Sequence, residues 1–312
     1  MTEVIKPDSS GLARAAAILD DGGLVGMPTE TVYGLAGDAA NDRAVAAIYQ
    51  AKGRPSFNPL IVHVADVDQI SPLGHLSDSA KRLADAFWPG PLTLVLPLRD
   101  DAPVSALVTA GLPTLAVRVP GHPVSRALLQ TFGRGVAAPS ANPSGRVSPV
   151  SAAHVIAGLD GRIDAVLDGG ECSVGLESTI VGFADASPMI LREGGVPAEA
   201  LAEVLGRPLA VREEAGAITA PGQMASHYAP VGRVRINVTQ PEPEETFVGF
   251  GPVECDLNLS ENADLAEAAA NLFRHFHQLD AMGATRIAVA PVPDEGLGRA
   301  INDRLRRAAA PR

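Results

Sequence analysis

Residues 52–64 form the stretch of the sequence in which closely spaced polar groups are best suited to chemistry. Lys52 is one of only three lysines in the chain, and a glycine, which lets the backbone approach a ligand closely, separates it from Arg54. Ser56 and Asn58 follow as neutral donors, and two prolines stiffen the segment. This combination suits an anion such as a triphosphate. A solvated basic loop is the alternative interpretation.

The distribution of charge along the chain favours the anion site. The sequence has 25 Lys and Arg against 36 Asp and Glu, for a formal net charge of −11. Residues 43–65 and 102–159 nevertheless contain no acidic residue, although both windows contain arginines. An acidic protein that excludes carboxylates from two long windows keeps a local positive field there. The exclusion of acids from apolar strands explains part of the same pattern.

Three further polar segments follow predicted strands. They span residues 28–35, 139–149 and 167–180, and they are rich in Ser, Thr and Asn. Ligands of open α/β sheets bind where strand ends meet such loops, so we expect these segments to face a ligand. In the first segment, Thr29 acting only as a turn cap is the alternative.

Arg118 alternates with apolar residues in a predicted strand, 114–119, and shares one face with Thr114 and Ala116. A half-buried arginine needs an anionic partner. No acid lies nearby in the sequence, so a ligand carboxylate or phosphate is one candidate, and a distant Asp or Glu is the other.

The elements that must position these groups alternate between strands and helices, which predicts an α/β fold. The length of 312 residues favours two domains. We expect a catalytic domain over 1–205, a linker over 206–232 and a smaller α/β domain over 233–312. Predicted helices end near residues 20, 51, 88, 132, 205, 282 and 309, with caps at Ser9 or Ser10, Asn41, Ser77 and Asn262. Predicted strands span 24–27, 60–64, 92–98, 114–119, 135–138, 189–192, 233–238 and 286–292.

The linker contains Met224, His227 and Tyr228 between two proline-containing ends. A passive tether would be rich in Gly and Ser or in Pro throughout. We therefore interpret the segment as a lid that covers the site, with Tyr228 contributing its ring and hydroxyl. Anchoring of the second domain by Tyr228 is the alternative.

Several common catalytic and binding patterns are absent from the sequence. It has no Walker A loop, no Gly-x-Gly-x-x-Gly and no Gly-x-Ser-x-Gly. Two distant cysteines and seven histidines form no metal-binding spacing, so no protein metal site is expected. No signal peptide or membrane span is expected either, and a cytoplasmic location is the simplest inference.

Seven motifs resemble the threonylcarbamoyl-AMP synthases in content and order, and the linker residues 227–230 match the long, two-domain form. The resemblance implies a twisted, open, mixed α/β sheet with a concave active site, plus a smaller C-terminal Rossmann-like domain. It also implies that L-threonine, bicarbonate and ATP give threonylcarbamoyl-AMP and pyrophosphate. The motifs span residues 28–35, 52–60, 88–93, 118–120, 139–145, 177–180 and 191–194.

The resemblance also implies roles for individual residues. Arg118 would pair with the carboxylate of threonine, and Lys52 would lie near the phosphates. The threonine site would comprise Thr31, His63, Arg118, Ala138 and Ser178. The ATP site would comprise Lys52, Arg54, Asn58, Thr114, Ser140, Asn142, Ser148, Arg192 and Tyr228.

The same resemblance implies that Mg²⁺ accompanies ATP and that no organic cofactor is tightly bound. The product would pass to a tRNA threonylcarbamoyltransferase complex, for modification of adenosine in certain transfer RNAs. Two other functions stay open. Hydrogenase-maturation proteins share the domain but have cysteine-rich zinc segments, which two cysteines cannot supply. The second is double-stranded RNA binding without catalysis, and weak RNA binding is compatible with the synthase function as well.

Overall fold

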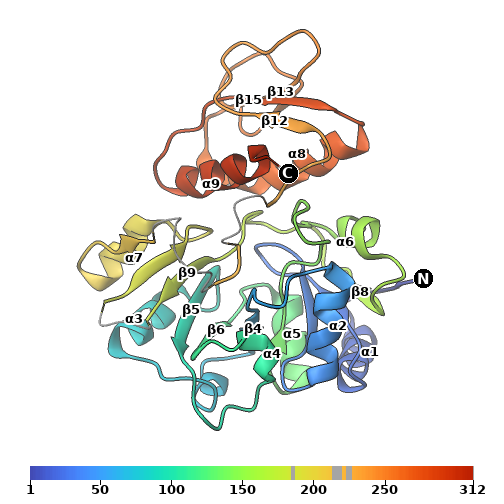
Figure 1. Cartoon of the computed structure of the whole chain (residues 1–312), viewed down its shortest axis with the longest axis vertical. Coiled ribbons are helices and arrows are strands. Elements are labelled where there is room, and N and C mark those ends of the chain that lie inside the picture. The colour runs from blue at the N-terminus through green and yellow to red at the C-terminus, as the bar shows by residue number, and fades with distance from the viewer. Residues whose placement is uncertain (184–186, 213–219, 223–226, 312) are drawn as a thin grey trace.

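The computed structural model describes residues 1–183, 187–212, 220–222 and 227–311, which form two α/β units stacked along the long axis of the molecule (Figure 1). The larger unit contains an eleven-stranded mixed sheet, and the smaller contains a four-stranded sheet whose described pairs are all parallel. This arrangement confirms the predicted fold class. No helix among the described residues is long and apolar enough to cross a membrane.

The large sheet has the strand order β1-β8-β2-β3-β7-β4-β6-β5-β9-β10-β11. Parallel and antiparallel pairs are mixed within it; β4 and β6 run parallel, and β5 and β6 run antiparallel. The strands are β1 (Glu3–Ile5), β2 (Val25–Met27), β3 (Gly34–Asp38), β4 (Ile61–His63), β5 (Leu92–Pro97), β6 (Thr114–Arg118), β7 (Val136–Ala137), β8 (Ala165–Leu167), β9 (Thr179–Gly182), β10 (Met189–Arg192) and β11 (Ala210–Val211).

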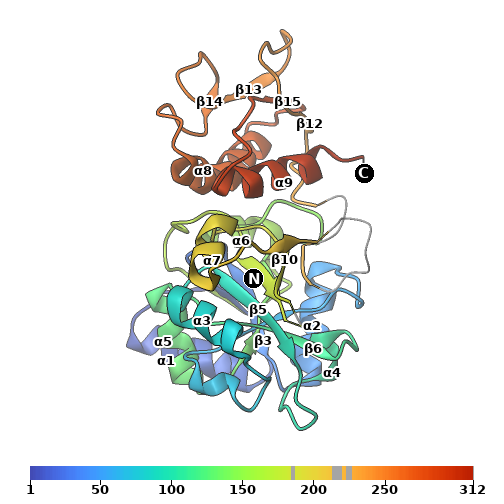
Figure 2. The ribbon, with the colours of Figure 1, turned by 90° about the vertical axis from the view of Figure 1, so that its left-hand side faces the viewer.

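The small sheet has the order β12-β15-β13-β14. Helices α8 and α9 lie between this sheet and the larger unit (Figures 1 and 2). Its elements are β12 (Arg233–Arg235), β13 (Thr246–Gly249), β14 (Leu257–Asn258), α8 (Leu265–Ala281), β15 (Arg286–Val289) and α9 (Leu297–Ala309).

Every helix of the larger unit except α7, which follows Pro197, begins at a side chain that accepts hydrogen bonds from free N–H groups of the first turn. Asn41 and Ser77 cap α2 and α3, as predicted. Asp8, not Ser9 or Ser10, caps α1, because its carboxylate accepts from the N–H of Gly11; Asp264, not Asn262, caps α8, because its carboxylate reaches two N–H groups of that helix. These helices are α1 (Ser9–Asp20), α2 (Asp42–Lys52), α3 (Asp78–Phe87), α4 (Ala106–Thr109), α5 (Pro123–Phe132), α6 (Ala152–Leu159) and α7 (Ala198–Leu205), with a 3-10 turn η1 (Asp68–Ile70).

Several strands were not predicted from the sequence, among them β3 and β11. β3 consists of Gly-Leu-Ala-Gly-Asp, which contains no β-branched residue, yet it pairs with β2 and β7 and is fully buried. Here tertiary pairing outweighs weak local propensity. β11 lies inside the predicted linker and pairs with β10. The borders at 205 and 232 stay predictions.

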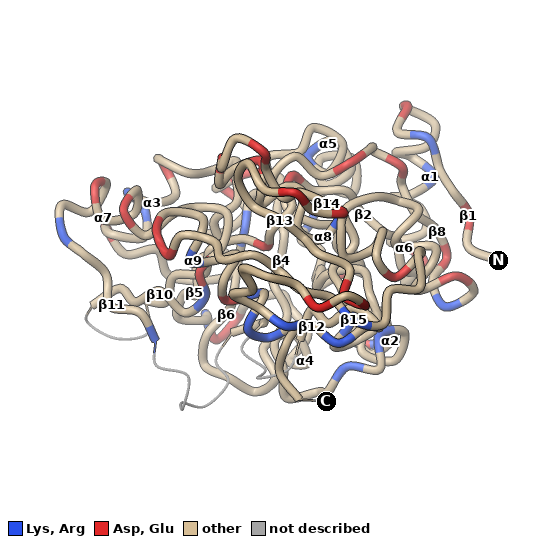
Figure 3. Tube along the Cα trace, turned by 90° about the horizontal axis from the view of Figure 1, so that it is seen from above, with Lys and Arg blue, Asp and Glu red and all other residues tan. Residues whose placement is uncertain are grey.

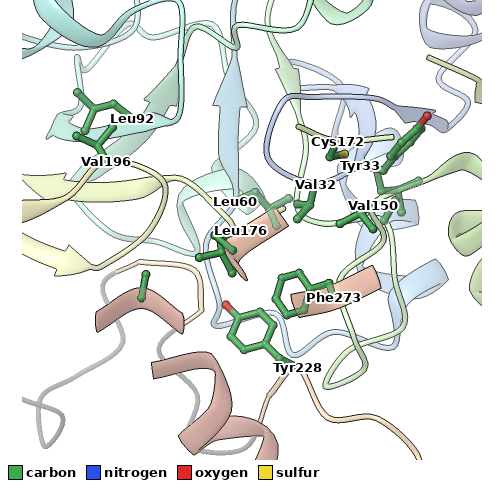
Figure 4. Close-up of a cluster of buried hydrophobic side chains, with 14 of the residues drawn as sticks. Val32, Tyr33, Leu60, Leu92, Val150, Cys172, Leu176, Val196, Tyr228 and Phe273 are labelled. Atoms are coloured by element: carbon green, nitrogen blue, oxygen red, sulfur yellow. The ribbon is translucent and has the colours of Figure 1, made fainter. Parts of the chain in front are cut away.

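The hydrophobic core continues from the larger unit into α8 and α9. Figure 4 shows Phe273 of α8 beside Tyr228 of the linker, close to Leu176 of the larger unit. Gly175 lies directly against α8, because a Cβ at this position would be 2.5 Å from the Cα of Ala270. Only glycine permits this approach.

We expect Gly175→Ala to weaken the docking of the two units. Both Gly175 and Gly170 have positive φ, so alanine costs roughly 1–3 kcal/mol of backbone strain at either position. Only at Gly175 does the new methyl group also collide with a helix, since a Cβ at Gly170 meets nothing within 4 Å. Thermal unfolding should therefore show a lower Tm for Gly175→Ala than for Gly170→Ala. Equal Tm values would contradict the close approach.

Two histidine rings stack across the interface. His154 of α6 and His277 of α8 have ring centres 3.8 Å apart and planes 15° apart, and His277 Nε2 lies 3.0 Å from the carbonyl oxygen of Ser148. Burial, and then the neighbouring His277 and Arg274, lower the pKa of His154 to about 4. Burial also lowers the pKa of His277, against the opposing effects of Ser148 and Asp280. Both rings are therefore neutral at pH 7.

This stack predicts a loss of stability in acid. The unfolded chain protonates these histidines near pH 6.5, whereas the folded chain takes up the same protons only at lower pH. The free energy of unfolding should therefore fall between pH 6.5 and about 4. Urea unfolding at pH 7.5 and pH 5 measures this loss. His154→Phe keeps a flat ring without a titrating group, so its loss should be smaller; an unchanged loss would rule out the stack as a source.

Candidate active site

A cavity of about 50 Å³ lies over one face of the central strands of the large sheet. His63 of β4 and Arg118 of β6 are register partners and project into it together. The covering side of the cavity comes from the predicted linker, through Pro221, Gly222 and Tyr228, among others. The cavity is lined by Thr29, Thr31, Val32, Gly34, Arg54, Ile61, His63, Arg118, Ala138, Pro139, Ser140, Glu177, Ser178, Arg192, Pro221, Gly222, His227 and Tyr228.

The structure brings together most of the residues that the sequence predicted for the site. All five predicted threonine-site residues and four of the nine predicted ATP-site residues line the cavity. The first set is Thr31, His63, Arg118, Ala138 and Ser178, and the second is Arg54, Ser140, Arg192 and Tyr228.

The remaining five predicted residues do not line the cavity. Four of them touch groups that do: Lys52 Nζ and the Asn142 N–H both donate to the carbonyl oxygen of Ser140, Ser148 Oγ donates to Glu177 at 2.6 Å, and the Asn58 carbonyl oxygen accepts from Arg54. Asn58 is fully buried beside Arg54. Thr114 begins β6, roughly 13 Å of strand away from Arg118. A ligand contact for these residues stays a prediction.

Arg118 pairs with an acidic residue that is distant in the sequence. This was one of the two partners expected for it, the other being an anionic group of a ligand. Its Nη2 donates to Glu30 Oε1 at 2.5 Å, and its Nη1 donates to Thr31 Oγ1 at 2.9 Å. Its Nε donates to the carbonyl oxygen of Gly90. Burial alone would raise the pKa of Glu30, but the charge of Arg118 and its hydrogen bond outweigh burial and lower this pKa. Two N–H groups of the guanidinium have no acceptor among the described residues and are available to a ligand.

Three other buried cations have no such partner. Among the described residues, no carboxylate lies within salt-bridge distance of Lys52, Arg54 or Arg192. Arg54 donates to the carbonyl oxygens of Asn58 and Pro59, and Arg192 to the carbonyl oxygens of Ser178 and Pro221. Burial and the repulsion of Arg54 hold the pKa of Lys52 well below its usual value, and burial lowers that of Arg54 to about 10. Buried charge of this kind is costly without an anion.

Unpaired amide groups lie beside these cations. Neither the Nδ2 nor the Oδ1 of Asn58 has a hydrogen-bond partner, although the side chain is completely buried. The Oδ1 of Asn142 is also unpartnered, whereas its Nδ2 donates to two carbonyl oxygens. Buried polar groups nearly always have partners. The amides therefore indicate a polar ligand on the side of the site where Lys52 lies.

Among the described residues, Glu177 is the only acidic residue that lines the cavity. Seen from above, many Asp and Glu residues lie on or beside peripheral elements such as α3, α7, β8 and β14 (Figure 3). The net charge of −11 is thus compatible with a positive interior site.

Sequence reasoning did not assign a site role to Glu177, which lies in the Glu-Ser-Thr-Ile motif and lines the cavity. Its carboxylate accepts from Ser148 Oγ and, at 2.8 Å, from Nε of Arg304 in α9. Burial would raise the pKa of Glu177, but Arg304, Arg192 and the Ser148 hydroxyl lower it below its usual range. A motif search could have identified Glu177 and Glu30, whereas no local pattern marks Arg304.

Tyr228 lies next to both the cavity and the second unit. Its ring centre lies 5.6 Å from that of Phe273 in the second unit, and the residue also lines the cavity (Figure 4). Its φ of 63° is unusual for a residue other than glycine and costs roughly 1–3 kcal/mol, so the surrounding contacts hold it there. Met224 lies outside the described residues, and the lid interpretation stays a prediction.

The cavity is much smaller than the roughly 300–1,000 Å³ typical of ligand pockets. Gly222, one of the residues that cover it, lies close to both Arg192 and Tyr228: a Cβ on Gly222 would be 2.9 Å from Arg192 Nη1 and 2.7 Å from the Tyr228 hydroxyl. A ligand of nucleotide size therefore requires these covering residues to move.

Two family models match the chain and together cover nearly all of it. Residues 17–194 match the model described as "Telomere recombination". Residues 196–310 match the model described as "Threonylcarbamoyl-AMP synthase, C-terminal domain".

Curated proteins and solved structures agree with these models. The threonylcarbamoyl-AMP synthase of Bacillus subtilis is 40% identical, and the alignment covers 100% of this chain and 96% of that protein. The synthase of Pyrococcus abyssi is 38% identical over 95% of this chain and 93% of its own length. The crystal structure of P. abyssi Sua5 complexed with L-threonine superimposes with a TM-score of 0.90, at 36% identity over 99% of this chain and 97% of that one. The chain therefore belongs to the threonylcarbamoyl-AMP synthases, a family of nucleotidyltransferase-type enzymes.

Proposed function

We propose that this enzyme converts L-threonine, bicarbonate and ATP into threonylcarbamoyl-AMP and pyrophosphate. The observation that carries the proposal is the set of three buried cations, Lys52, Arg54 and Arg192, that have no described carboxylate partner. A polyphosphate supplies the negative charge that they lack. The names of the relatives and the threonine complex of the P. abyssi protein support the choice of substrates.

Threonine would bind on the Arg118 side of the cavity. The free N–H groups of Arg118 suit its carboxylate, and the ion pair with Glu30 fixes the plane of the guanidinium. Burial and the charge of Arg118 lower the pKa of His63 to about 3, so this ring is neutral at pH 7 and does not attract an anion. Thr31, Ala138 and Ser178 would complete the threonine site.

ATP would bind on the side of the unpartnered cations. Lys52, Arg54 and Arg192 would face the phosphates, and the Asn58 amide would gain the partners that it lacks. Ser140, Asn142, Ser148 and Tyr228 lie in or beside the same wall. Thr114 is the predicted ATP contact with the least structural support, because it begins β6 at the strand end away from Arg118.

The reaction would proceed in two steps. The threonine amine combines with bicarbonate, forming an N–C bond and releasing water, to give a carbamate. A carbamate oxygen then attacks the α-phosphorus of ATP, and the bond to the bridging oxygen breaks, so that pyrophosphate leaves with the electron pair. The protein contributes positioning and charge stabilisation, since Lys52, Arg54 and Arg192 would balance charge that builds on the leaving group.

Mg²⁺ would arrive as part of the ATP complex. The described residues contain no group of three or more His, Cys, Asp or Glu side chains that could hold a metal ion. The carboxylates of Glu30 and Glu177 are also already paired with arginines. The residues present thus fit a nucleotide-borne ion better than a protein-held one.

The mixed anhydride would serve threonylcarbamoylation of adenosine in transfer RNA, through a downstream transferase complex. Such an anhydride is prone to hydrolysis, so a site covered by the linker suits its formation.

Pyrophosphate release from ATP should require both threonine and bicarbonate. Without either substrate no carbamate forms, and the α-phosphorus has no nucleophile other than water. A coupled pyrophosphate assay with each substrate omitted in turn measures the requirement, with bicarbonate removed by degassing. Equal turnover without threonine would refute the proposed reaction.

Substitution of two arginines should separate the substrates. Arg118→Gln should weaken threonine binding by about 10- to 150-fold, the equivalent of one charged hydrogen bond, and Arg54→Gln should weaken ATP binding by a similar factor. Isothermal titration with each substrate distinguishes the two effects. Arg118→Gln leaves Glu30 unpaired, so Arg118→Gln combined with Glu30→Gln is the control for stability. Loss of ATP binding in both arginine variants, with normal threonine binding, would overturn the assignment.

A further inference from the structure

We propose that Arg304, a residue of the C-terminal unit, is a positioning residue of the nucleotide site that keeps the charge of Glu177 away from the cations that bind phosphate. The inference rests on the proposed function and concerns the same site.

Arg304 is completely buried at the junction of three parts of the chain. From α9, its Nε donates to Glu177 Oε2 at 2.8 Å, and its Nη2 donates to the carbonyl oxygen of Glu193 at 2.9 Å. Its Nη1 donates to Asp303 at 2.6 Å. The guanidinium carbon lies 5.1 Å from the centre of the Tyr228 ring, within cation–π distance.

Attachment of α9 to the larger unit does not explain this burial. A fully buried ion pair contributes little net stability, and an apolar residue of similar size would pack at least as well. Arg299 of the same helix already links the two units through Glu193 and Glu199, at a partly exposed position. Arg304 differs from Arg299 because its partner, Glu177, lines the cavity.

The negative charge of Glu177 would weaken phosphate binding at the site unless another residue neutralised it. It is a buried carboxylate in a cavity where phosphates are proposed to bind, and it also attracts Arg192 electrostatically. Without Arg304, Glu177 would repel the phosphates and compete with them for Arg192. Arg304 instead holds one oxygen of the carboxylate, while the other accepts from Ser148 Oγ. Lys52, Arg54 and Arg192 then keep their charge for the nucleotide.

The decisive variants are Arg304→Met, the same change combined with Glu177→Gln, and Arg299→Met as the matched control from α9. Isothermal titration with ATP and with threonine, on the full chain, gives the dissociation constants. Arg304→Met should raise the constant for ATP about ten-fold or more, the equivalent of one charged interaction. The constant for threonine should change by less than about two-fold, since the Glu177 carboxylate is hydrogen-bonded to Arg304 and Ser148 and not to a residue assigned to threonine. Addition of Glu177→Gln should restore most of the ATP affinity, whereas Arg299→Met should bind both ligands normally.

The variant Glu177→Gln alone tests the inference even if Arg304→Met does not fold. The amide keeps the shape of the side chain and can still accept from Ser148, so ATP should bind at least as tightly as in the unmodified protein. Weaker ATP binding by Glu177→Gln, or normal ATP binding by Arg304→Met, would overturn the inference. Equal losses of ATP and threonine affinity would also overturn it, because they would show a general structural role. Absence of ATP binding by the unmodified protein would instead refute the proposed function.

Discussion

Burial of positive charge without enough protein carboxylates is the constraint on which the rest of the site depends. Lys52, Arg54, Arg118, Arg192 and Arg304 all lie in the interior, and among the residues that the structure describes only Arg118 and Arg304 of these five pair with acids. Burial of Lys52, Arg54 and Arg192 therefore costs several kcal/mol of desolvation free energy per ion unless an anionic ligand compensates for it. The fold tolerates this cost because backbone carbonyl groups accept hydrogen bonds from all three. Such a site is incomplete without an anion.

The second unit and the linker also contribute residues that contact the charged groups of the site. Arg304 enters from α9 to neutralise Glu177, and Tyr228 packs on Arg304 and Phe273 while lining the cavity. The core is continuous across the interface, so docking and site geometry are linked. This arrangement gives the C-terminal unit a physical role at the site, although its own sequence contains no polar loop like those of the larger unit.

Much of the fold and of the site was predictable from the sequence because the informative signals are local. Asn41 and Ser77 cap helices as expected, and the polar loops around Thr31, Ser140 and Ser178 meet at one cavity. The location over a face of the central strands was not predicted, because it depends on how distant segments pack. The Arg118–Glu30 pair and the Arg304–Glu177 pair could not be predicted for the same reason. In each pair the two residues are about 90 or more positions apart in the sequence. Strand β3 was missed because its small residues carry no strand pattern.

The response of the protein's stability to pyrophosphate tests the central claim most directly. If the interior cations lack an anion, pyrophosphate should raise the Tm at constant ionic strength, because a ligand that binds only the folded state stabilises it. Sodium chloride of equal ionic strength should not have this effect. In Lys52→Met the rise should be largely lost, while in Arg299→Met, whose altered residue lies outside the site, it should persist. An unchanged Tm in pyrophosphate, or the same rise in Lys52→Met as in the unmodified protein, would contradict the account.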